Sequence, residues 1–193
     1  MTAMVAPNAP ASFRRAIASL AHGHLRDGVE IGELAAPTKL APWTHAISVN
    51  MLAPGGAEVA SGRLVVLHDP AGVAAWDGTL RVVVFATCEI EDEIARDQAL
   101  PQVVWSWLTE ALALHAVPFV ALGGTVTATS STRFGDIAGP PRTDDLELRA
   151  SWTATGDDLS RHLSAFAAFL ASAAGLPPEG VAPIRDRRHP TGV

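Results

Sequence analysis

Hydrophobic and polar residues alternate with a period of two along several stretches of the chain, and each such stretch is predicted to be a β-strand with one face toward solvent. The clearest are 47–51, 86–90, 125–129 and 146–153. Pro54, Gly55 and Gly56 predict a turn that joins the first of them to an extended segment at 59–67. A weaker run at 29–34 predicts one more strand. Because several strands have a polar face, antiparallel pairing is favoured.

Apolar residues recur every three or four positions in three other segments, which predicts amphipathic helices over 13–20, 101–112 and 159–170. Pro101 suits the first turn of the second helix. Asp157 or Asp158 can cap the N-terminus of the third.

The predicted elements follow the order αββββαββα, which indicates an α+β fold. We expect a mostly antiparallel sheet of about six strands with three main helices packed largely on one face. Residues 69–78 and 135–145, which contain turn-forming residues, are predicted to be loops. One domain is expected at 12–175, after a flexible leader at 1–11 and before a disordered tail at 176–193.

Composition narrows the functional class. The 193 residues are 48% hydrophobic, enough for one core, and the formal net charge of −6 disfavours nucleic-acid binding. One cysteine excludes an internal disulfide, and no targeting or membrane-spanning segment is recognisable, so a cytoplasmic location is expected. A basic C-terminal group could contact nucleic acid or an acidic partner, although a solubilising terminus is the favoured interpretation. It comprises Arg185, Arg187, Arg188 and His189.

The sequence contains no pattern that indicates a catalytic, cofactor or metal site. Cys88 falls on the apolar side of a predicted strand, and His22 and His24 lack a third ligand. The acidic run at 89–97 does not have the spacing of a calcium loop and is interpreted as a solvated strand edge and helix start. Gly123 and Gly124 precede a strand rather than a helix, so they are interpreted as turn glycines.

The helix at 101–112 carries the most distinctive residues, Trp105 and Trp107 followed by Glu110. Trp107 lies on the apolar stripe, whereas Trp105 is displaced from it and is a candidate interface anchor. A wide apolar face that buries both rings is the alternative. The first functional hypothesis is therefore a non-enzymatic interaction or chaperone-like module that binds protein, including itself as a homodimer, through Trp105, Trp107 and Glu110.

The second hypothesis is a small-molecule-binding protein or small enzyme. His68 and Asp69 at the end of a strand could act as a base and its orienting carboxylate. The loop at 69–78, with Trp76, would roof a cleft in which Arg149 binds an anionic substrate. Against this, Asp69–Pro70 is also a good turn opener, and no nucleophile motif accompanies it.

Four blocks in a fixed order carry a family resemblance: GRLVVLHDPAG at 62–72 with Trp76, WSWLTEAL at 105–112, RASW at 149–152 and AGLPP at 174–178. Together they resemble the actinobacterial family called domain of unknown function 3000, over about 13–183. The resemblance implies a cytoplasmic, actinobacterial protein and assigns no activity or site residue. The element order is also similar to that of small α+β chaperones of secretion systems, which dimerise and bind client segments, a likeness of fold alone.

Overall fold

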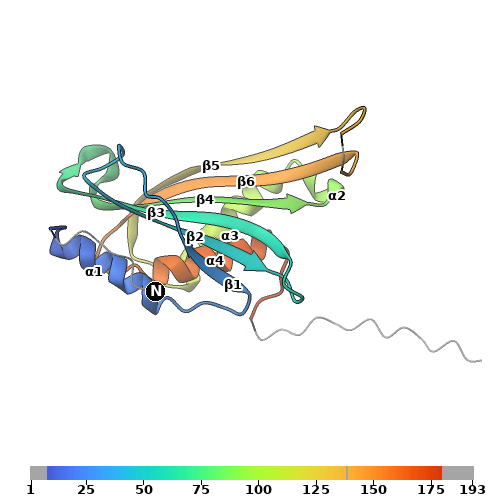
Figure 1. Cartoon of the computed structure of the whole chain (residues 1–193). Helices are drawn as coiled ribbons and strands as arrows, with labels where there is room; N and C mark the ends of the chain where they lie inside the picture. Colours follow the sequence, from blue (N-terminus) through green and yellow to red (C-terminus); the bar gives the residue numbers. More distant parts are fainter. Residues whose placement is uncertain (1–7, 138, 180–193) are drawn as a thin grey trace, which may run out of the picture.

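The computed structural model describes residues 8–137 and 139–179. Its centre is a six-stranded antiparallel sheet in the order β1-β2-β3-β4-β6-β5 (Figure 1). The strands are β1 (Val29–Glu33), β2 (Trp43–Leu52), β3 (Glu58–Val73), β4 (Gly78–Ile90), β5 (Phe119–Thr132) and β6 (Arg142–Ala154). Only the last pair departs from chain order, because β6 inserts between β4 and β5.

The main helices lie on one side of this sheet (Figure 1). They are α1 (Ala11–Ser19), α3 (Leu100–Leu114) and α4 (Ser160–Ala173), with a short α2 (Asp92–Ala95) at the end of β4. No helix in the described ranges is long and apolar enough to cross a bilayer.

Strand alternation creates the core. Val84 of β4 lies opposite Leu64 of β3 and Ala150 of β6, and all three face the helices and are buried. Their sequence neighbours face the other way and include Val65, Val83 and Phe85, so each strand separates an inner face toward the helices from an outer face of mixed polarity. We call these the inner face and the outer face of the sheet.

A glycine lets α4 approach the inner face closely. A Cβ atom added at Gly62 of β3 would lie 2.7 Å from Cζ of Phe166, so only glycine leaves room for this ring. Phe166 stacks with Phe169 at a centroid distance of 6.4 Å, and both rings are fully buried. Gly62 therefore lets α4 pack directly on β3.

The predicted class, the antiparallel sheet and the element order are confirmed. Both predicted loops were too long. β3 continues to Val73, followed by a 3₁₀ turn and Asp77 in the left-handed region at φ 56°, so only a tight turn joins β3 to β4. β6 begins at Arg142, inside the second predicted loop, because its ladder with β5 extends that far.

The termini of the domain are packed within the described residues. Ala9 is buried, and Leu176 packs against the core while its amide donates to the carbonyl of Ala171. Most of the expected leader and the basic residues at 185–189 lie outside the described residues, so the proposed domain limits stay a prediction.

Candidate functional site

A groove between α3 and α4 has a volume of about 950 Å³. We call it the helix groove. Its apolar wall includes Trp107, Leu114, Ala168 and Leu176. Polar groups stand among the lining residues, namely His24, Arg26, Glu110, His115, Ser172 and Glu179.

The spacing of α3 explains why this groove exists. Val104, Leu108 and Leu112 point to the sheet and are fully buried. Trp107 and Leu114, seven residues apart, share a neighbouring face of the helix that turns toward α4 and solvent. The Leu114 side chain is 81% exposed, so the helix presents an apolar face that residues 8–137 and 139–179 leave uncovered.

The groove is closed at one end by charged and polar contacts. Nε2 of His24 lies 3.6 Å from Oε2 of Glu179, and the Arg26 guanidinium donates to the carbonyl of Pro177 at 3.0 Å. The pKa of His115 is lowered, first by burial and then by His24, while Glu179 acts in the opposite direction. These contacts attach residues 176–179 beside α4.

The two tryptophans have different surroundings. Trp107 and Glu110 line the helix groove. Trp105 lies against β5 instead, where its Cζ3 is 2.9 Å from the position that a Cβ at Gly124 would occupy. Both indoles are half-buried. The structure therefore groups Trp107 with Glu110, and it places Trp105 between α3 and the sheet.

His68 is a buried residue of the inner face, only 3% exposed, and its ring stacks on Phe13 of α1 at 5.9 Å. Its Nδ1 lies 2.9 Å from the carbonyl of Thr79, and its Nε2 lies 3.3 Å from Oγ of Ser12. A carbonyl only accepts, so Nδ1 donates to Thr79. In the tautomer whose single proton is on Nδ1, Nε2 accepts from the Ser12 hydroxyl, which is the orientation of a serine beside a histidine base.

The other residues of the expected ligand site lie elsewhere. Asp69 points away from His68, as neighbours on a strand do, and accepts from the amide of Ala71, two residues further along β3. Arg149 is on the outer face, where its Nε donates to Glu147 at 2.7 Å. The sheet thus separates Arg149 from His68. Trp76 is half-buried in the β3–β4 turn, and its carbonyl accepts from Thr153.

Ser12 was not found from the sequence. It precedes His68 by 56 residues and belongs to no motif, and only the packing of α1 on the inner face of β3 brings the two together. No sequence pattern around Ser12 predicts this contact.

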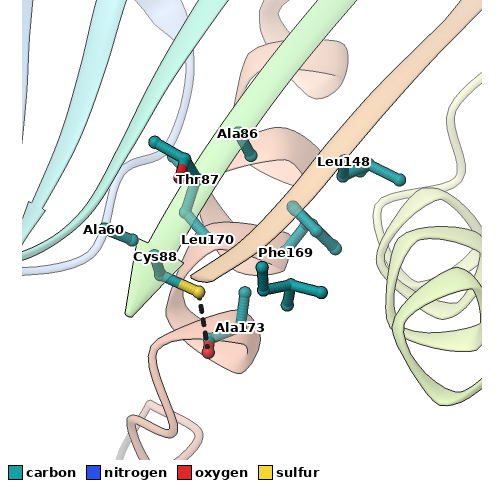
Figure 2. Close-up of a pocket in the computed structure, with 9 residues that line it drawn as sticks. Ala60, Ala86, Thr87, Cys88, Leu148, Phe169, Leu170 and Ala173 are labelled. Atoms are coloured by element: carbon teal, nitrogen blue, oxygen red, sulfur yellow. Dashed lines mark hydrogen bonds between the residues drawn. The ribbon is translucent and has the colours of Figure 1, made fainter. Parts of the chain in front are cut away.

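Cys88 is a core residue, as its strand position predicts. Its thiol points at the carbonyl of Ala173 at 3.4 Å among Ala60, Phe169 and Leu170 (Figure 2). Burial raises the pKa of the thiol to about 11, and the charge of Asp145 adds to the rise. A protonated, enclosed thiol is a poor nucleophile.

The acidic segment forms ion pairs. Asp92 in the first turn of α2 lies 2.7 Å from Arg96 and 3.1 Å from Arg142, and Arg142 also binds Asp144 at 2.9 Å. The hydrogen bonds from Arg142 and Ser130 lower the pKa of Asp144. Among residues 8–137 and 139–179, no group of three His, Cys, Asp or Glu side chains is arranged to hold a metal ion.

These features define a class: an α+β protein built on one antiparallel sheet, with an apolar groove between its two longest helices. The chain belongs to the family described as protein of unknown function (DUF3000), which matches residues 9–182. No curated protein and no solved structure matches it.

Proposed function

We propose that this protein is a non-enzymatic binding module that holds an apolar segment of a partner protein in the helix groove. The observation that carries the proposal is the pairing of half-buried Trp107 with Leu114, 81% exposed, in one cavity of about 950 Å³. An exposed leucine beside an aromatic ring is typical of an anchor site for an apolar side chain.

The shape and charge of the groove support a peptide-like occupant. Two helices form its walls, as in grooves that receive an amphipathic helix or an extended segment. Five of its lining residues are alanines, whose small side chains leave room for a bulky side chain of the partner. Glu110, His24 and Glu179 at its margin can orient polar groups of that segment.

Site-directed photo-cross-linking tests the position of the partner. A photoreactive residue at Leu114 is expected to capture one defined protein in cells. The same residue at Leu40, which is 60% exposed and outside the groove, is the matched control. Equal capture from both positions would contradict the proposal.

The affinity for the captured segment then tests whether Trp107 anchors it. With the captured segment as a synthetic peptide, Trp107→Ala is expected to raise the Kd by about 30-fold, in the range of a hot-spot aromatic. Ser106→Ala, also half-buried on α3 but outside the groove, is the control. An unchanged Kd in Trp107→Ala, with the fold retained by circular dichroism, would remove the helix groove as the site.

Three broader expectations belong to this proposal. The chaperone-like role rests on the exposed apolar groove, because client binding needs such a surface. The cytoplasmic location rests on the single buried cysteine. The actinobacterial origin rests on the sequence resemblance.

A second candidate function is supported by the Ser12–His68 contact, which favours a serine hydrolase for small esters. Ser12 is half-buried in the first turn of α1, and the Thr79 carbonyl holds the His68 tautomer that accepts its proton. In such a reaction, Oγ of Ser12 would bond to the acyl carbon as the ester C–O bond breaks, and Nε2 would pass the hydroxyl proton to the leaving alcohol. Water would then attack the acyl group on Ser12, releasing the acid and restoring the hydroxyl.

A fluorophosphonate probe discriminates this candidate from a purely structural contact. Labelling of Ser12, lost in both Ser12→Ala and His68→Gln, would support the hydrolase. Ser19→Ala, another serine of α1, is the control. Absence of labelling at Ser12 in the native protein would leave His68 as a core residue with two hydrogen bonds.

A further inference from the structure

The two edges of the sheet differ in length and in charge. β1 is an edge strand of five residues that carries Glu30 and Glu33, and charges on an edge oppose pairing with another chain. β5, at the other edge, has 14 residues and contains neither a charged residue nor a proline. Figure 1 shows β5 as the outermost strand on the side of the sheet away from β1. β5 therefore lacks the side chains that usually protect an edge strand.

Most of β5 is a regular strand with small side chains. The register shift in the β5–β6 pair lies between Val120 and Gly123, and the pairing is unbroken from Gly123 to Thr132. All of these ten residues are exposed except Val126, which is half-buried. Their side chains are those of Gly, Ala, Ser, Thr and Val. A further strand can therefore approach this edge without displacing a large side chain.

The backbone groups of every second residue of β5 point away from β6. The amide of Arg133 donates to the carbonyl of Pro141 at 2.8 Å, so these two residues form a hydrogen-bonded pair of the β5–β6 hairpin. Hydrogen-bonded and non-hydrogen-bonded pairs alternate in an antiparallel ladder. Residues 125, 127, 129 and 131 therefore bond to β6, whereas residues 124, 126, 128, 130 and 132 direct their N–H and C=O groups to the free edge. Within the described ranges, no segment of the chain covers these groups with a further strand.

This edge is complementary to itself. A two-fold axis beside Ala128 places residue 124 of one copy opposite residue 132 of the other, residue 126 opposite residue 130, and Ala128 opposite its own copy. Each outward-pointing residue then meets another one, which gives about ten interchain hydrogen bonds. Thr127 faces Thr129, and Thr125 faces Ser131, and such cross-strand pairs stabilise a sheet. Because β5 is uncharged, no like charges meet in this register.

Apolar side chains at the two ends of β5 also match. The half-buried indole of Trp105 reaches the edge from the inner face, because its Cζ3 would lie 2.9 Å from a Cβ at Gly124. Phe134, 80% exposed, follows the other end of the strand. An axis perpendicular to the sheet at Ala128 keeps both inner faces on the same side and brings the Thr132 end of each copy to the Gly124 end of the other. Trp105 of one copy then lies at the end of the interface that holds Phe134 of the other.

We propose that two copies of this chain bind edge to edge through β5, so that their sheets join into one continuous antiparallel sheet. A second copy is favoured over an extended segment of another protein, because the outward backbone groups and the two apolar ends satisfy one another in a single two-fold register, as an isologous interface requires. The inference is independent of the helix groove, because none of the described residues that line the groove belongs to β5.

The mass in solution and a proline at the axis test the proposal. By light scattering, the full chain at about 100 μM should have twice its 20.1 kDa mass, because about ten main-chain hydrogen bonds, set against the entropy cost of association, give a micromolar Kd. Ala128→Pro removes an N–H that points to the free edge, where an edge strand tolerates proline. With the fold retained by circular dichroism, it should raise the Kd at least about 30-fold. Trp107→Ala, in the helix groove, should leave the Kd unchanged.

Charges introduced at Ala128 test the register. Because Ala128 faces its own copy, Ala128→Asp and Ala128→Lys should each dimerise at least about 10-fold more weakly than the wild type. An equimolar mixture of the two should form a heterodimer that is tighter than either homodimer and weakens in about 1 M NaCl. Ala75→Asp, at an exposed alanine of the turn between β3 and β4, is the matched control and should dimerise as the wild type does.

Amide exchange gives a signature that other interfaces would not produce. The amides of Val126 and Ser130 point to the free edge and should be protected only in the dimer. Those of Thr127 and Thr129 bond to β6 and should be protected in both states. Hydrogen exchange followed by NMR, in the wild type and in Ala128→Pro, measures this alternation.

Three results would overturn the proposal. One is a wild-type chain that stays monomeric up to about 1 mM, including a chain whose β5 pairs only with an extended segment of another protein. Another is a dimer whose Kd is the same in Ala128→Pro and in Ala128→Asp as in the wild type. The third is equal exchange of the Val126 amide in the monomer and the dimer. None of them would affect binding in the helix groove, which cross-linking at Leu114 tests separately.

Discussion

The indole N–H of Trp152 donates a hydrogen bond of 2.8 Å to Nδ1 of His162, and the two rings stack at 6.2 Å. Trp152 is in β6 and His162 is in α4, so this contact attaches the helix to the inner face. Both side chains are almost completely buried. Because Nδ1 accepts, the neutral ring carries its proton on Nε2, which has no partner within the described residues.

This contact predicts acid sensitivity. Burial lowers the pKa of His162 from 6.5 to about 4. The unfolded chain therefore binds more protons than the folded chain between these two pH values, so stability is full above pH 6.5 and is lost as the pH falls toward 4. The change in pKa from 6.5 to about 4 corresponds to a loss of about 3 kcal/mol in the free energy of unfolding. Urea denaturation at pH 7, 5.5 and 4.5 measures it.

The variant His162→Leu isolates this contribution. It should be less stable at pH 7, because the Trp152 N–H loses its acceptor, but its stability should fall less between pH 6.5 and 4. His45 and His115, whose pKa values burial also lowers, remain in both proteins and cancel in the comparison. A pH dependence identical to that of the wild type would show that His162 does not stay neutral in the folded state.

Two neighbouring glycines in β5 predict opposite outcomes for the same substitution. A Cβ at Gly124 would clash with the carbonyl oxygen of Arg149 and lie 2.9 Å from Cζ3 of Trp105, whereas a Cβ at Gly123 meets nothing within 4 Å. Gly124→Ala should lower the free energy of unfolding by about 2 kcal/mol through overpacking. Gly123→Ala should change it by less than about 0.5 kcal/mol. Chemical denaturation of both variants measures the difference.

This pair of glycines also tests the position of Trp105. The double variant Gly124→Ala, Trp105→Ala removes the indole that the new methyl group would meet. If Trp105 packs on β5, the two changes are not additive, and the double variant loses less stability than the sum of the single ones. Strict additivity would place Trp105 elsewhere.

The periodicity of apolar residues along the chain explains which structural features could be predicted from the sequence. Alternation at 86–90 and 146–153 placed Cys88 in the core and Arg149 on the polar face, both as observed. The same rule puts His68 inside, in line with Leu64 and Val66. His68 was instead assigned to the end of a strand, because Asp69 and Pro70 are typical of a turn. In the structure, β3 continues to Val73.

The contacts that build the sites depend on tertiary packing. The helix groove needs α3 and α4 side by side, and the Ser12–His68 contact joins residues that are 56 positions apart. Strand order decides which strand forms the free edge, and β6 reaches β4 only because β5 moves to that edge. A periodicity of two or 3.6 residues carries no information about these neighbours.

The thiol of Cys88 gives a last prediction, on chemical reactivity. A pKa of about 11 leaves about one thiol in 1,000 ionised at pH 8, and the enclosing side chains add a barrier to access. Native protein should therefore react with Ellman's reagent at least about 100-fold more slowly than protein unfolded in urea. In the variant Thr127→Cys, the added thiol on exposed β5 should react at once, while Cys88 stays protected. If both thiols of that variant react together in buffer, the end of the core between β4 and α4 opens in the native state, and the burial that raises the Cys88 pKa is not maintained in solution.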